Sequence, residues 1–224
     1  MKKQFYNQFK NSYLQTFDDK KENRKGFTIC EPIRWISANQ SRLVKLNESG
    51  GGVFFTPNPC KGGRKETNVT SIEWVYADLD EGTKDQMLER IDASPIVPNF
   101  IVETARGYHL YWKCKCERKE FDRIIKGVIK FFDSDPAISS TNEVLRLPGF
   151  NHMKGEPFMV NVEYSDMNNI QTPEEMIKAF PYIPIMLEFK EKHNLTETNF
   201  DLIKQAPIKE LLNKFGVKFR EIIS

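Results

Sequence analysis

Two aspartates that alternate with apolar residues are the first candidates for chemistry. In residues 73–80 (EWVYADLD), Asp78 and Asp80 are separated by a single residue. Strand side chains alternate between the two faces, so both carboxylates share one side, with Cα atoms about 6.5 Å apart, while the apolar residues between them face the core. Hard carboxylate oxygens are the ligands that Mg²⁺ and Mn²⁺ prefer. The pattern indicates a metal site at a strand end. The alternative is that the two acids only end the strand in a solvated acidic turn.

A histidine follows in a tight connection between two predicted strands. Residues 105–112 (ARGYHLYW) place His109 just past Gly107. Neighbouring strands lie about 4.8 Å apart, so this histidine can sit beside the strand that carries the aspartates. An imidazole there can donate a hydrogen bond to a phosphate. The alternative is a histidine that only packs within its strand.

Further charged residues lie between residues 133 and 154. Asp135 follows a predicted helix, where it either supplies a third carboxylate or starts the turn that Pro136 continues. Arg146 lies between two leucines, so its guanidinium must find an anion or reach solvent, and a triphosphate or nucleic-acid phosphate is a suitable anion. Lys154 adds a point charge, unless it is an ordinary solvated lysine.

The elements that must position these residues follow the order β-α-β-β-α-β. The strands are predicted over residues 72–80, 99–104, 108–113 and 144–147, and the helices over residues 84–91 and 117–132. The second helix carries one apolar stripe at helical spacing, made of Phe121, Ile124, Ile125, Val128 and Phe132. We expect this stripe to cover one face of a sheet in a mixed α/β (α+β) fold.

Shorter elements precede this frame. Residues 1–70 predict a small α/β part, with a helix around 39–46 and a strand over 53–56. Polar residues with scattered aromatics fill the first 25 positions, which fit a helix and a loose arm equally well.

Other elements follow the frame. A strand is predicted over residues 158–164, and Thr172 followed by proline opens a helix with an N-cap. The compact domain is predicted to close near Tyr182. Residues 183–224 are rich in lysine and glutamate and predict a helical extension or connector.

Composition sets outer bounds on function. The 224 residues include 33 lysines and arginines and 31 aspartates and glutamates, which gives a net charge of +2. A charge this small does not by itself indicate a polyanionic partner. No apolar run approaches the roughly 18 residues of a membrane span, and the polar N-terminus does not resemble a signal peptide. We therefore expect a cytoplasmic protein with no membrane partner, in which the four cysteines are reduced.

Any contact with nucleic acid must then come from clustered cations. The loop over residues 57–68 contains Lys61, Arg64 and Lys65 just before the strand that bears the aspartates. These three cations are candidates for contacting a single-stranded template. The alternative is a solvated connector whose lysines touch nothing.

Taken together, the motifs resemble the archaeo-eukaryotic primase superfamily, in particular the primase-polymerase domains of plasmid, phage and CRISPR-linked replication proteins. That superfamily shows an apolar strand ending in D-x-D, here Asp78 and Asp80, and then a small-x-His element, here residues 107–109. A later acid follows, and in the plasmid-type branch it precedes an R-L-P-G segment, here residues 146–149. The resemblance covers roughly residues 27–164.

The resemblance implies a fold and a set of metal ligands. Residues 1–182 would form the catalytic domain, with a palm-like core of the RNA-recognition-motif type over residues 71–182. Asp78, Asp80 and Asp135 would hold two Mg²⁺ or Mn²⁺ ions, with Glu143 competing with Asp135 for the third place. The side chains implied to bind the incoming nucleotide are His109, Arg106, Arg146 and Lys154, where Arg106 occupies a position at which serine is frequent.

The implied activity is template-dependent nucleotidyl transfer, as a DNA primase, a DNA polymerase or both, in the replication or repair of a mobile element or related system. The partners would be a single-stranded DNA template and NTPs or dNTPs. The sequence has no G-x-x-x-x-G-K-[ST] motif, so a helicase, if one is used, lies on a partner or on a further C-terminal region. The alternatives are a catalytically silent module that binds single-stranded nucleic acid and a metal-dependent nuclease.

Overall fold

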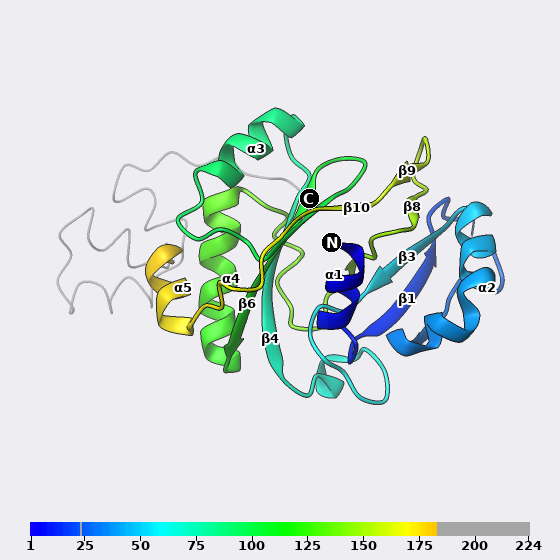
Figure 1. Ribbon diagram of the computed structural model, residues 1–224, viewed down its shortest axis with the longest axis horizontal. Coiled ribbons are helices and arrows are strands. Elements are labelled where there is room, and N and C mark those ends of the chain that lie inside the picture. The colour runs from blue at the N-terminus through cyan, green and yellow to red at the C-terminus, as the bar shows by residue number, and fades with distance from the viewer. Residues whose placement is uncertain (23, 183–224) are drawn as a thin grey trace, which may run out of the picture. The chain divides into compact units, whose positions relative to one another are not determined.

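A computed structural model describes residues 1–22 and 24–182 (Figure 1). The helical extension predicted for residues 183–224 lies outside the described residues. The helices and strands run in the order α1 (Lys2–Gln8), β1 (Tyr13–Asp18), β2 (Cys30–Pro32), α2 (Ile36–Glu48), β3 (Gly51–Phe55), β4 (Ile72–Leu79), α3 (Lys84–Asp92), β5 (Phe100–Glu103), β6 (Tyr108–Cys116), α4 (Arg118–Phe132), β7 (Leu145–Arg146), β8 (Asn151–His152), β9 (Phe158–Met159), β10 (Asn161–Ser165) and α5 (Pro173–Ala179). Short 3₁₀ turns precede α2 and β4.

The larger sheet carries the predicted aspartates and histidine. Its strand order is β10-β5-β6-β4, and every neighbouring pair is antiparallel. In the register of β4 and β6, Asp78 lies directly opposite His109. The prediction that these two strands are neighbours is therefore confirmed.

Helix α4 covers one face of this sheet, with α3 and α5 beside it (Figure 1). The five residues of its predicted apolar stripe are all buried. On the strands, Val75, Ala77 and Leu79 are buried as the alternation predicts. Burial of this stripe is the main reason that the helix forms here, because a single amphipathic helix gains most of its stability from packing.

A second sheet, of order β2-β1-β3-β7, lies on the side of the larger sheet away from α4. The N-terminal residues supply both a helix and a strand: α1 confirms the helical alternative, and β1 was not predicted. Strand β1 pairs with both β2 and β3, so it forms the centre of this sheet.

The last strand of the predicted β-α-β-β-α-β order, β7, belongs to the second sheet and not to the larger one. The β-α-β-β-α-β order is confirmed along the chain, but β7 pairs with β3 and so belongs to the second sheet. The fourth place in the larger sheet goes to β10, which pairs with β5. The predicted parts 1–70 and 71–182 therefore share a sheet, because backbone pairing between Phe54 and Arg146 joins them.

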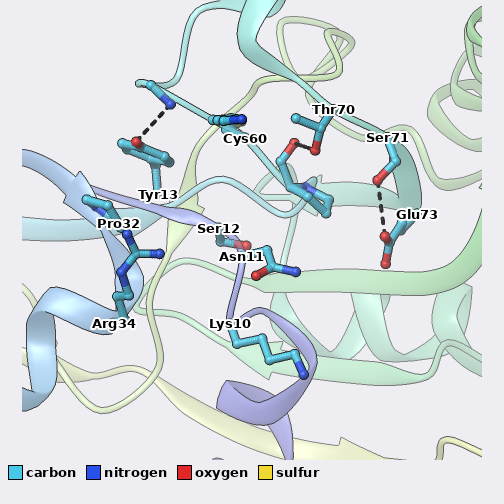
Figure 2. A pocket seen from close by; sticks show the side chains of 13 residues that line it. Lys10, Asn11, Ser12, Tyr13, Pro32, Arg34, Cys60, Thr70, Ser71 and Glu73 are labelled. Carbon is cyan, nitrogen blue, oxygen red and sulfur yellow. Dashed lines mark hydrogen bonds between the residues drawn. The ribbon is translucent and has the colours of Figure 1, made fainter.

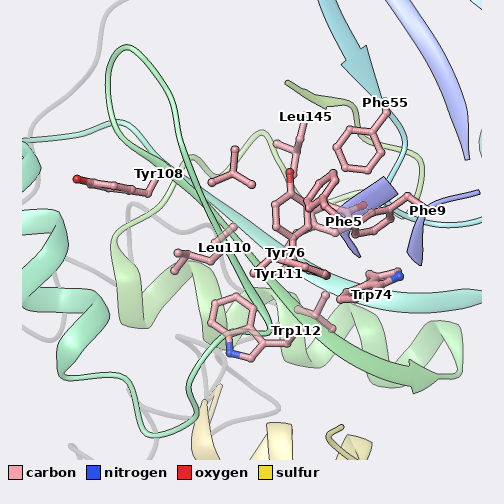
Figure 3. Packing of buried hydrophobic residues seen from close by; sticks show 14 of the residues in the cluster. Phe5, Phe9, Phe55, Trp74, Tyr76, Tyr108, Leu110, Tyr111, Trp112 and Leu145 are labelled. Carbon is pink, nitrogen blue, oxygen red and sulfur yellow. The ribbon is translucent and has the colours of Figure 1, made fainter. Parts of the chain in front are cut away.

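Helix α1 fills the space between the two sheets. Figure 3 shows Phe5 of this helix and Phe9, which directly follows it, among the aromatic side chains of β3, β4 and β6. Phe5 lies edge-on to Tyr111 at 5.6 Å between ring centroids, and Phe9 lies 4.7 Å from Trp74 and 4.9 Å from Phe55. Edge-on and tilted geometries are favourable for aromatic rings, so α1 anchors the second sheet to the first.

Among the described residues, no helix is long and apolar enough to cross a membrane.

Gly127 tests how tightly α4 is packed. Exchange of a helical glycine for alanine ordinarily stabilises a helix by about 1 kcal/mol. Here, however, an added Cβ would overlap the backbone oxygen of Phe180, which follows α5. We expect Gly127→Ala to lower the free energy of unfolding by about 1–3 kcal/mol, as overpacked cores do. Urea unfolding measures this, and an unchanged or raised midpoint would show that α5 yields to the methyl group.

Candidate active site

A small cavity of about 90 Å³ lies where β4 and β6 meet the segment around β7 and β8. Two parts of the chain that are far apart in sequence supply its walls. The lining residues that carry polar or charged side chains are Asp78, Asp80, Thr104, Arg106, His109, Arg146, His152 and Lys154.

Asp78 and His109 form the centre of the cavity. The His109 Nε2 atom lies 3.4 Å from Asp78 Oδ1, and the Tyr111 hydroxyl lies 3.5 Å from His109 Nδ1. Burial, with the adjacent charges of Arg146 and His152, lowers the pKa of His109 to about 3. The ring is therefore neutral at pH 7, and the arrangement fits the tautomer in which Nδ1 accepts from the Tyr111 hydroxyl and Nε2, near Asp78, carries the hydrogen.

The carboxylates around Asp78 crowd one another. Burial, and then the like charges of Asp80 and Asp135, raise the pKa of Asp78 to about 7. The backbone N–H of Asp135 donates to the Asp78 carbonyl oxygen at 2.9 Å, which holds this third acid beside the strand end. Uncompensated negative charge of this kind is relieved by a cation.

Two contacts hold the other acids. Arg106 Nη2 donates to Asp80 Oδ2 at 2.6 Å, so Arg106 pairs with an acid of the site in this conformation. One Asp135 oxygen accepts from the N–H of Ala137 at 2.9 Å, which is the turn-starting role. Among the residues described by the structure, no group of three His, Cys, Asp or Glu side chains is arranged to hold a metal ion.

The donor set nevertheless fits a hard divalent ion. All three acids supply oxygen atoms, which Mg²⁺ and Mn²⁺ prefer. The acids whose charges raise the pKa of Asp78 are Asp80 and Asp135, and Glu143, the competing candidate, is not among its main influences. Arg106 is 65% exposed, so it can leave Asp80 without opening the core.

Arg146 already has an internal anion. Its guanidinium is buried and makes a bidentate pair with Asp19, at 2.9 and 3.2 Å. It also stacks on Phe54, with its guanidinium carbon 4.5 Å from the ring centroid. The expectation that this arginine must find an anion or reach solvent is confirmed, and the anion inside the protein is the carboxylate of Asp19, just after β1. Arg146 still lines the cavity and adds positive charge to it.

Asp19 and His152 were missed by sequence reasoning. Asp19 follows β1, a strand that was not predicted, and no local pattern links it to an arginine 127 residues away. His152 lies in β8, is 5% exposed and lines the cavity. Its position two residues before Lys154, in a segment already rich in charge, was the available signal. Lys154 itself is exposed at the cavity.

The loop cations lie elsewhere. Lys61 lines a separate and larger hollow of about 410 Å³, together with Lys10 and Arg34 (Figure 2). Arg64 is half-buried and its Nε donates to Gln15 at 2.8 Å, whereas Lys65 is exposed. None of these three predicted residues lines the cavity that holds Asp78.

The fold and the site define the class of protein. An antiparallel sheet with paired aspartates opposite a histidine, packed against an N-terminal sheet, is a domain of the archaeo-eukaryotic primase-polymerase type. The structure is similar to the primase-polymerase domain of cyanophage S-2L, with a TM-score of 0.67, 14% identity, and coverage of 80% of this chain and 96% of that one. It is also similar to the catalytic domain of primase RepB′ in complex with initiator DNA, with a TM-score of 0.58, 16% identity, and coverage of 86% and 95%.

The chain belongs to the family described as the RepB DNA-primase N-terminal domain, which residues 35–192 match. A replication protein of Clostridium perfringens is 26% identical over an alignment of 156 residues that covers 58% of this chain. The match spans 37% of the length of that relative.

The Asp19–Arg146 pair gives a stability prediction. Removal of one partner of a buried ion pair leaves an uncompensated charge and costs about 3–5 kcal/mol, whereas replacing both partners by apolar residues is often neutral. We expect Asp19→Ala to lower the free energy of unfolding by about that amount, and Asp19→Leu/Arg146→Met to lower it much less. Urea unfolding of both variants measures the difference, and equal losses would show that apolar residues cannot replace the pair and that the cost does not come from an unpaired charge.

Proposed function

We propose that this chain is a template-dependent nucleotidyltransferase, a DNA primase, DNA polymerase or both, that acts with two divalent ions. The observation that carries the proposal is the grouping of Asp78 and Asp80 with the cations of Arg106, Arg146 and Lys154 around one cavity, with Asp135 near enough to act on Asp78. Acids and cations around one cavity suit metal ions and a triphosphate held there. The family to which the chain belongs supports the same class of reaction.

The acids would hold Mg²⁺ or Mn²⁺. Bound there, the ions would neutralise charge on the attacking 3′-oxygen and on the leaving pyrophosphate. The raised pKa of Asp78 supports this role, because burial and two neighbouring carboxylates disfavour its ionised form until a cation is present. Arg106 would exchange Asp80 for the nucleotide, as its high exposure permits.

His109 has a role close to the acids. Its Nε2–H would orient Asp78, and its ring edge faces the cavity in which a triphosphate would lie. Arg146, fixed by Asp19, would contribute a positive field, and Lys154 would add a mobile charge at the mouth. The assignment of His109, Arg106, Arg146 and Lys154 to the nucleotide is part of this proposal.

DNA would be the template. Initiator DNA is present with the catalytic domain of primase RepB′, a protein of the same fold. We propose a single-stranded template for this chain, with motor activity supplied by a partner helicase or a further region of the protein.

A metal-dependent nuclease and a silent binding module are the alternatives. Incorporation of labelled nucleotides on primed and unprimed single-stranded templates, with Mg²⁺ or Mn²⁺, separates all three. A transferase lengthens the primer or makes new strands, a nuclease shortens the template, and a silent module does neither.

Removal of either strand-end acid tests the metal site. We expect Asp78→Asn and Asp80→Asn each to reduce nucleotide incorporation by more than about 100-fold, which is the upper end for losing a group that only supports a metal ligand. Both variants keep the side-chain volume, and Asp78→Asn keeps an acceptor for His109, so thermal stability should be retained. Asp92→Asn, an exposed acid of α3, is the matched control and should retain full activity. Near-normal incorporation by the two site variants would exclude the metal-site assignment.

The loop cations test the template path. Each phosphate contact on a single strand contributes roughly 0.7 to the slope of log affinity against log salt, so three contacts contribute about 2. Replacement of Lys61, Arg64 and Lys65 by alanine should reduce the slope by this amount in fluorescence-anisotropy titrations of single-stranded DNA. Arg64 is held by Gln15, so its share should be the smallest of the three.

A charge-matched control removes the same three charges from the outer face of α4. Lys119, Arg123 and Lys126 are exposed there, and their replacement by alanine should leave the slope unchanged. If the two triple variants behave alike, the loop is only a connector and the template follows another surface, such as the one around Lys113, Lys115 and Arg118.

A further inference from the structure

The hollow in Figure 2 brings together cations from three separate segments of the chain. Lys10 follows α1, Arg34 lies in the 3₁₀ turn before α2, and Lys61 lies in the loop after β3. All three are exposed, and their side chains have no ion-pair or hydrogen-bond partner among the described residues. Glu73, the one acid among the described lining residues, already pairs with Lys113 at 2.8 Å. The hollow is therefore positive, and its lining leaves the positive charge unbalanced within the described part of the chain.

Hydrogen bonds fix these three segments to one another. The backbone N–H of Ile33 donates to the carbonyl oxygen of Ser12 at 2.9 Å, and the N–H of Cys60 donates to that of Asn11 at 3.2 Å. The N–H of Gly62 donates to the Tyr13 hydroxyl at 3.0 Å (Figure 2). The chain over residues 11–13 thus holds a neighbour on each side. The cations are gathered before a ligand arrives, which lowers the entropy lost on binding.

The size of the hollow and the placement of its cations indicate which anion it suits. A water occupies about 30 Å³ in the liquid, so a hollow of about 410 Å³ is much larger than one phosphate group. Its cations are exposed and come from different segments, whereas a site for one small anion brings buried donors to a single point. Successive phosphates of a nucleic-acid strand match this arrangement, because each can meet one lysine or arginine. The hollow therefore favours a phosphodiester chain.

Strands β1 and β4 both lead from the hollow to the cavity that holds the acids. Tyr13 begins β1 and Glu73 is the second residue of β4, and both line the hollow. Asp19 directly follows β1, and Asp78 is the last residue but one of β4. The distance along β4 from Glu73 to Asp78 is about 17 Å, at about 3.4 Å per residue. One strand of B-form DNA spans this distance in about five nucleotides, because its rise is also about 3.4 Å.

We propose that the hollow binds the phosphate backbone of the single-stranded template, about five nucleotides from the nucleotide that is copied. Lys10, Arg34 and Lys61 would each meet a phosphate. This inference rests on the proposed template-dependent transfer. It extends the template surface from the loop over residues 57–68 to the end of α1 and the turn before α2, and it places that part of the surface away from the acids.

The salt dependence of DNA binding by the full chain tests the charges of the hollow. In fluorescence-anisotropy titrations of an oligothymidylate of about 20 nucleotides, Lys10→Ala/Arg34→Ala should reduce the slope of log affinity against log salt by about 1.4, because each lost contact removes roughly 0.7. Lys10→Arg/Arg34→Lys retains both charges and should retain the slope. Lys119→Ala/Arg123→Ala removes two exposed cations of α4 and is the matched control, whose slope should not change.

The length of the template tests the position of the hollow. A dideoxy-terminated primer with dATP opposite a template dT, in Mg²⁺, fixes the register without transfer. The unpaired template then extends either about two or about twelve nucleotides past the templating base, on either side of the expected five. Wild-type protein should bind the longer template about 2- to 30-fold more tightly, which is the range that two exposed ion pairs give. Lys10→Ala/Arg34→Ala should lose most of this gain and bind the shorter template as the wild type does.

The outcomes separate this inference from the proposed function. A wild-type protein that incorporates nucleotides, while Lys10→Ala/Arg34→Ala keeps the wild-type slope or keeps the gain from a longer template, overturns the role of the hollow alone. A wild-type protein that incorporates no nucleotide, while the variant loses about 1.4 from the slope, overturns the transferase proposal and leaves the DNA-binding hollow in place. A variant that binds free dATP more weakly without DNA, at an unchanged slope, assigns the hollow to a free nucleotide and overturns its assignment to DNA.

Discussion

The buried ion pair between Asp19 and Arg146 is the interaction on which the site depends. It links the end of β1 to β7, and Asp19 also accepts a hydrogen bond from the N–H of Met153. One carboxylate thereby fixes both the arginine that lines the cavity and the backbone next to His152. A charge pair this buried contributes little net stability compared with apolar packing, so its value lies in specifying which strands meet.

This pair also sets the electrostatics of the cavity. Arg146, which is paired with Asp19, lowers the pKa of Asp78 less than burial and the charges of Asp80 and Asp135 raise it, so the pKa of Asp78 stays raised. Arg106 then pairs with Asp80 from the solvent side. Arg146 is thus held in a buried pair with Asp19, whereas the exposed Arg106 pairs with Asp80. A metal ion bound by the acids can take the place of Arg106.

Local periodicity explains what could be predicted. The alternation around Asp78 and the apolar stripe of α4 each depend on residues a few positions apart, and both are confirmed by burial. The sheet to which β7 belongs and the partner of Arg146 depend on contacts across more than 90 and more than 120 residues. No local period carries such pairings, and with β1 unpredicted, Asp19 had no strand to place it. A short hairpin such as β8–β9 is similarly too brief for a reliable pattern, which is why His152 was missed.

The shared sheet makes the two parts of the chain one functional unit. Residues before position 71 supply β1, β3 and Asp19, whereas the acids and both histidines of the cavity come after it. Without the first part, Arg146 would be a buried cation with no partner, and β7 would lose its only backbone neighbour among the described strands. The face of β6 that carries Tyr111 would also lose the aromatic side chains of α1 that cover it. The segment that carries Arg146, His152 and Lys154 would then no longer be fixed beside the acids of β4. The N-terminal sheet is therefore the part that turns a strand end bearing two aspartates into a cavity of definite size.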